Sequence, residues 1–126
     1  MMTEEKYKYR FDSSLGILFK YYYGNIDLSD IISSWEYAFE NNLIPKETKG
    51  FILDYRKATF KIEIEKHTSI ADFYKNHIDV FGDFKIAILT EEPRDVVIPV
   101  LVKSQDEGYF SRPFSTLEAA IVWVLS

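Results

Sequence analysis

The chain has 126 residues, of which 47% are hydrophobic and 28% charged, and it carries a net charge of −5. This length and composition are typical of one globular domain, so we expect a single domain over residues 1–126. The acidic balance disfavours nucleic acid and anionic membranes as partners. Cysteine is absent, which excludes disulfides and thiolate chemistry and favours a reducing compartment.

The N-terminal residues are polar and acidic, which is unlike a secretory signal peptide. The longest apolar run, from Val96 to Val102, is too short to span a bilayer. We therefore expect a cytoplasmic protein without a membrane span.

The chain opens with two predicted strands. Aromatic and basic residues alternate from Lys6 to Phe11, turn residues follow at 12–14, and an apolar segment runs from Ile17 to Tyr23. This pattern predicts a β-hairpin at a sheet edge. Basic residues interleaved with aromatic ones can also bind nucleic acid, but an edge strand with one wet face fits the acidic chain better.

Helices and strands alternate in the rest of the chain. Pro99 argues against a central strand at 96–102 and favours a helix that begins near Asp95. The segment Ser115 to Glu118 has the sequence of a capping box, which opens a final helix. The other predicted elements are a helix capped by Asp27, a buried strand at 51–53, a helix within 64–81, and strands at 84–89 and 109–114.

This order predicts an α/β fold. We expect a mixed, mostly parallel central sheet of four to five strands, with an N-terminal β-hairpin and about four helices.

Two stretches give the chain a family resemblance. The first, residues 51–60, is an apolar strand that ends in Asp54 and is followed by a short predicted loop. The second, residues 112–125, is a strand followed by a capped helix that ends in a Trp-Leu-type pair. Together with the element order, they resemble the SpoIIAA-like branch of the STAS superfamily. The resemblance implies a SpoIIAA/STAS-like fold, and most of this branch has no assigned activity.

The chain departs from that family at its phosphorylation site. Anti-sigma-factor antagonists of the superfamily carry a phosphorylated serine after the loop, whereas residues 61–66 contain no serine or threonine. The family's phosphorylation switch is therefore not carried over to this chain.

A small polar site is predicted at the carboxyl ends of the strands, where open α/β sheets bind ligands. The candidate ligand-binding residues follow the strands or lie in the adjoining loops; they are Asp54, Arg56, Thr59, Thr90, Glu91 and Arg94. In the alternative interpretation, Asp54 caps a turn and the arginines are only solvated.

No catalytic residues, metal site or cofactor are predicted. His67 and His77 are ten residues apart, so they cannot bind one metal from a straight helix. The glycines form neither a P-loop nor a dinucleotide-binding fingerprint.

Three function classes remain open at this point. The leading one is a non-catalytic interaction or regulatory module that acts through a protein partner. The alternative is a small-molecule or lipid-binding protein with a pocket between sheet and helices, and the third is an enzyme centred on Asp54. We also expect a homodimer, because the aromatic hairpin offers Tyr7, Tyr9 and Tyr22 as interface residues.

Overall fold

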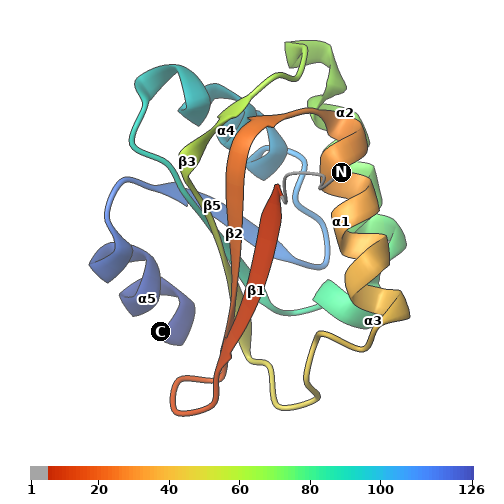
Figure 1. The fold of residues 1–126 in the computed structure, drawn as a ribbon, viewed down its shortest axis with the longest axis vertical. Helices are drawn as coiled ribbons and strands as arrows, with labels where there is room; N and C mark the ends of the chain where they lie inside the picture. The colour runs from red at the N-terminus through yellow and green to blue at the C-terminus, as the bar shows by residue number, and fades with distance from the viewer. Residues whose placement is uncertain (1–5) are drawn as a thin grey trace, which may run out of the picture.

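The protein is a five-stranded sheet with helices on both faces (Figure 1). The structure is a computed structural model that describes residues 6–126, except for the side chains of residues 93 and 94. The strands lie side by side in chain order, with β1 antiparallel to β2 and all other neighbours parallel. The predicted mixed sheet with its N-terminal hairpin is confirmed. The strands are β1 (Tyr7–Asp12), β2 (Ile17–Ile26), β3 (Gly50–Phe60), β4 (Lys85–Leu89) and β5 (Phe110–Phe114).

The helices are divided unequally between the two faces. Crossovers between parallel strands are right-handed, so a sheet whose parallel strands follow chain order places all connecting helices on one face. Figure 1 shows α5 alone on the opposite face. The helices are α1 (Leu28–Glu40), α2 (His67–Asn76), α3 (Ile78–Phe81), α4 (Val97–Lys103) and α5 (Leu117–Leu125), with short 3₁₀ turns η1 (Ile64–Lys66) and η2 (Pro93–Val96).

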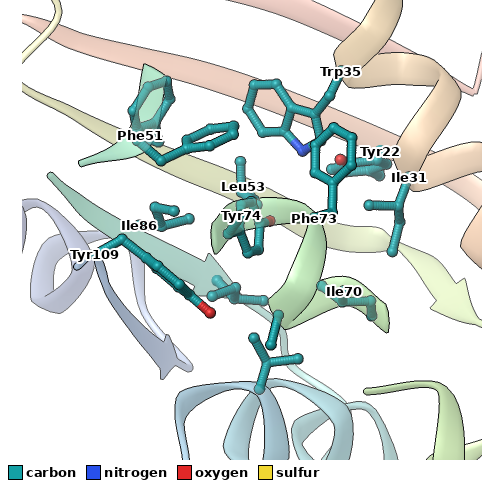
Figure 2. Packing of buried hydrophobic residues seen from close by; sticks show 14 of the residues in the cluster. Tyr22, Ile31, Trp35, Phe51, Leu53, Ile70, Phe73, Tyr74, Ile86 and Tyr109 are labelled. Carbon is teal, nitrogen blue, oxygen red and sulfur yellow. The ribbon is translucent and has the colours of Figure 1, made fainter. Parts of the chain in front are cut away.

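The larger core lies between the sheet and α1, α2, α3 and α4, and it is rich in aromatic residues (Figure 2). Trp35 of α1 is at its centre, with its ring edge-on to Phe51 at 5.8 Å and to Phe81 at 5.0 Å between centroids. Edge-to-face pairs of this kind add to the gain from burying the rings.

The smaller core lies under α5, where Ala120 and Val124 pack on Ile52 and its neighbours. The helix approaches the sheet closely at Gly50, because a Cβ atom there would lie 2.4 Å from Cγ1 of Val124. The absence of a side chain at Gly50 therefore allows α5 to pack this close to the start of β3.

Two sequence predictions need correction. The loop predicted after Asp54 is wrong, because β3 continues to Phe60 and stays paired with β2 over that length. The predicted capping box at Ser115 is also wrong: the hydroxyl of Thr116 accepts the Ala119 amide, which moves the helix start by one residue.

The helix predicted near Asp95 is present as η2 followed by α4. Pro99 lies in the first turn of α4, where a missing N–H removes no intrahelical hydrogen bond.

Lys20 is fully buried in the larger core, a rare position for lysine. Its Nζ donates to the hydroxyl of Ser34 and lies 3.7 Å from the Trp35 ring centroid, and no carboxylate is paired with it among the described residues. Desolvation lowers the pKa of Lys20 well below its ordinary value of 10.5.

We predict that Lys20→Met stabilises the protein at neutral pH by about 1–4 kcal/mol, because it removes a desolvated amine from an apolar site. Because the pKa of Lys20 is lower in the folded chain than in the unfolded chain, the folded chain loses this proton at lower pH, and wild-type stability rises as pH increases toward 10.5. The difference in free energy of unfolding between Lys20→Met and wild type should therefore become smaller as pH rises from about 7 toward 10.5. Urea unfolding of both proteins at several pH values measures this difference.

The matched control is Lys8→Met, which alters an exposed lysine and should change stability by less than about 0.5 kcal/mol. A destabilised Lys20→Met variant would show that the amine contributes net stabilisation.

Candidate functional site

A β-bulge interrupts the pairing of β2 with β3. Tyr21 pairs with Asp54 and Tyr23 with Lys57, so two residues of β3 oppose Tyr22 alone. Bulges bend a strand and re-aim its side chains. Here the bulge lies at the carboxyl half of the parallel strands, the end at which open α/β sheets bind ligands.

Asp54 and Arg56 stabilise the bulge. One carboxylate oxygen of Asp54 accepts the main-chain N–H of Arg56 at 3.0 Å, and the guanidinium donates to both oxygens at 2.8–3.2 Å. These hydrogen bonds raise the pKa of Arg56. The carboxylate is nearly buried, whereas the Arg56 side chain keeps 35% of its surface exposed.

A hollow of about 410 Å³, here named the bulge pocket, opens beside the bulge on the sheet face that α5 covers in part. Alternation along β3 places Asp54 on the same face as Ile52, which packs under α5. No residue of α5 lines the hollow, so this part of the sheet face is open. The lining residues are Tyr21, Tyr22, Tyr23, Asp54, Arg56, Lys57 and Glu91.

Basic residues of β1 extend the pocket's rim. The Arg10 guanidinium donates from Nε and Nη2 to the Tyr21 hydroxyl, each at 3.2 Å. Lys8 lies over the Tyr23 ring, with its nitrogen 5.8 Å from the centroid. With Arg56 and Lys57, four basic side chains lie here against three carboxylates, which are Asp54, Glu91 and Asp12, the last 3.8 Å from Arg10.

The structure brings together three of the six residues predicted for the site. Asp54, Arg56 and Glu91 all line the bulge pocket. Thr90 is adjacent to it in the sequence, but it is buried and its amide donates to the Phe114 carbonyl. Thr59 lines a different hollow of about 250 Å³ near η2. Arg94 is in η2, and its side chain lies outside the described part of the chain.

The sequence analysis did not find Lys57 or the tyrosines Tyr21 and Tyr23 as site residues. Their positions depend on the register of β2 against β3, which shifts at the bulge. A register shift has no local sequence signal here, since the glycine that often marks a bulge is absent from residues 54–57.

The predicted tyrosine interface is wrong for Tyr22. This side chain is buried in the larger core and stacks on Tyr55 at 4.1 Å between centroids. Tyr7 and Tyr9 are half-buried against α1, where the Tyr9 hydroxyl donates to the Ser34 carbonyl. Burial raises the pKa of Tyr9, which keeps its hydroxyl protonated as this hydrogen bond requires.

The histidines are engaged individually. Each donates from Nδ1 to a main-chain carbonyl at 2.8 Å, His67 to Ile64 and His77 to Phe73. Within the described residues, no group of three or more potential ligands could hold a metal ion. In the same part of the chain, no helix combines the length and apolar character needed to cross a membrane.

No protein-family model and no curated protein matches the chain. Among solved structures, the chain is similar to an uncharacterized DUF3478-family protein with a SpoIIAA-like fold from Shewanella loihica PV-4. The two share 13% identity at a TM-score of 0.62, over 98% of this chain and 99% of that chain. It is also similar to the unphosphorylated anti-sigma factor antagonist SpoIIAA, with 11% identity, a TM-score of 0.46, and coverage of 94% and 96%.

The chain therefore has a SpoIIAA-like α/β fold, as its sequence predicted. At these identities the likeness defines the fold alone.

We predict that Asp54→Asn destabilises the protein, because it removes the charge that pairs with Arg56. The loss should be only about 1 kcal/mol, because solvent screens the pair at the partly exposed Arg56 side chain. Asp54→Ala should cost about 2–3 kcal/mol, since it also leaves the Arg56 amide without an acceptor. Urea unfolding measures both changes.

Glu91→Gln is the control, because this exposed residue lines the pocket without supporting the bulge. If Asp54→Ala destabilises no more than Glu91→Gln, Asp54 does not hold the bulge.

Proposed function

We propose that the protein is a non-catalytic interaction module that binds an acidic segment of a partner protein in the bulge pocket. The observation that supports this function is the open sheet face beside α5, where basic and tyrosine side chains gather on an acidic protein. Tyrosine and arginine are enriched at protein interfaces, and complementary charge guides partners together.

The non-catalytic part of the proposal rests on how the polar groups are used. A general base needs a free oxygen within reach of its substrate, whereas Arg56 occupies both oxygens of Asp54. The hydroxyl of Tyr21 accepts from Arg10, and among the described residues no carboxylate or imidazole accepts a hydrogen bond from it, so no general base is placed to remove its proton. The contacts of Arg56 with Asp54 and of Arg10 with Tyr21 therefore hold the two guanidinium groups in place and offer no route for proton transfer.

A regulatory role is proposed without the family's phosphorylation switch. Residues 61–66 offer no hydroxyl side chain, and they follow β3 directly.

The small-molecule alternative predicted from the sequence places a ligand between sheet and helices. The hollow at the centre of that layer, lined by Leu53, Tyr55 and Ile98 among others, has a volume of about 20 Å³. This is room for about one water molecule, so the observation favours the interaction module.

We predict that a hexaglutamate peptide binds wild-type protein at low ionic strength and shifts the amide NMR signals of Tyr23 and Lys57. Lys8→Glu and Lys57→Glu should each weaken binding by about fivefold, because each replaces an attraction by a repulsion. Added salt should weaken binding in all proteins by screening.

Lys103→Glu is the matched control, since it makes the same charge reversal on α4, which covers the opposite face. Equal loss of affinity in the control and the pocket variants would mean that only net charge matters. No saturable shifts in wild-type protein would refute an acidic partner.

The homodimer predicted from the sequence is proposed on a different surface. Exposed apolar side chains lie on α5 and β5, with Val122 70% and Phe110 53% exposed. We expect sedimentation equilibrium to give a mass above the 14.8 kDa monomer, and Val122→Glu to restore the monomer. A wild-type mass that stays at the monomer value would refute self-association.

A further inference from the structure

The two edges of the sheet differ in their main-chain groups, and the β1 edge is the open one. The Tyr23 N–H donates to the Lys6 carbonyl at 2.8 Å, which continues the antiparallel register of β1 with β2. Because hydrogen-bonded and non-bonded pairs alternate in such a ladder, the N–H and C=O groups of Tyr7, Tyr9 and Phe11 point away from β2. Among residues 6–126, no strand lies on that side of β1, so these groups can pair with an added strand.

The β5 edge is closed. The Phe110 N–H and the Phe114 carbonyl are hydrogen-bonded on the β4 side. Alternation then turns the main chain of Ser111 and Pro113 outward. The Ser111 N–H already donates to Asp106 at 2.6 Å, and proline has no N–H. Strand β5 therefore has no donor left for a neighbour, which directs strand addition to β1.

The side chains of β1 define what an added strand should carry. Alternation places Lys8 and Arg10, both exposed, on the face of the bulge pocket. Lys8 has no carboxylate paired with it among the described residues, whereas Arg10 lies 3.8 Å from Asp12. Tyr7 and Tyr9 lie on the other face, against α1. A strand with acidic residues on the first face and apolar ones on the second would gain cross-strand pairs on both.

The same side chains disfavour a second copy of this chain on the β1 edge. An antiparallel pair of β1 strands related by a twofold axis at Tyr9 would place Lys8 opposite Arg10 of the second copy. Like charges directly opposite each other destabilise a strand pair. Charge complementarity therefore favours an acidic segment of another protein.

From these features we infer that the partner's acidic segment binds in extended form and adds to β1 as a sixth strand of the sheet, with acidic side chains at alternate positions beside Lys8 and Arg10. Main-chain hydrogen bonds supply affinity in complexes of this kind, and alternate side chains supply specificity. Strand addition is a way of binding the acidic segment of the proposed function, so it rests on that function. It extends the contact surface from the basic rim of the bulge pocket to the β1 edge.

The test uses a capped six-residue peptide, the length of β1, in which glutamate and valine alternate. N-methylation of a peptide residue removes its N–H donor. In an antiparallel added strand the valines, opposite Tyr7, Tyr9 and Phe11, direct their N–H groups at β1, whereas in a parallel one the glutamates do so. We expect methylation of one set to weaken binding about tenfold or more, and methylation of the other set to change affinity by less than about twofold.

Amide hydrogen exchange of the protein gives a second measurement. In the free protein, the N–H groups of Tyr7, Tyr9 and Phe11 should exchange fast, because no described strand accepts them. Those of Lys8 and Arg10 are already bonded to β2. Saturating unmethylated peptide should slow exchange about tenfold at the first group and leave the second group unchanged.

Three outcomes would overturn strand addition, and only one of them also refutes the acidic partner. Peptide binding that Lys57→Glu weakens, but that both methylated sets share equally, would mean an acidic partner held without strand pairing. Slow exchange at Tyr9 in free protein whose mass is twice the 14.8 kDa monomer would place a second copy on the edge. The absence of any binding by the unmethylated peptide at low ionic strength would refute both the added strand and the acidic partner.

Discussion

The order of the strands is the constraint on which the rest of this structure depends. Because the parallel strands β2 to β5 follow one another in space as in sequence, right-handed crossovers place α1 to α4 together on one face. The opposite face is then left to whatever follows the last strand. A single helix, α5, covers it, and Gly50 lets that helix approach the sheet closely.

The unequal cover explains both the buried and the open parts of the molecule. On the side of α1, the aromatic core is dense enough to enclose Lys20 completely. On the side of α5, the helix covers the sheet only in part, and the bulge pocket lies where its cover ends. The bulge matters because Asp54 and Arg56 pair across it, which fixes a cationic side chain on an otherwise acidic protein.

Two hollows lie at opposite ends of the sheet and differ in chemistry. The bulge pocket is polar and open, with tyrosines and basic residues from β1, β2 and β3. A second cleft, of about 510 Å³, lies at the amino ends of the strands and has Phe39, Phe84 and His77 in its walls.

The sequence by itself determined the α/β class, the opening hairpin, the helix after Asp27 and the interruption of strand character by Pro99. These features depend on periodicity, capping and proline geometry, which act over a few neighbouring residues. It also placed Asp54 and Glu91 at the same end of the sheet, because parallel strands end together. Only the tertiary structure decided that Tyr22 points into the core, that β3 continues past Asp54, and that Lys57 joins the pocket. These features depend on the register between β2 and β3 and on how much of each face a helix covers, and both are set by contacts between residues far apart in the chain.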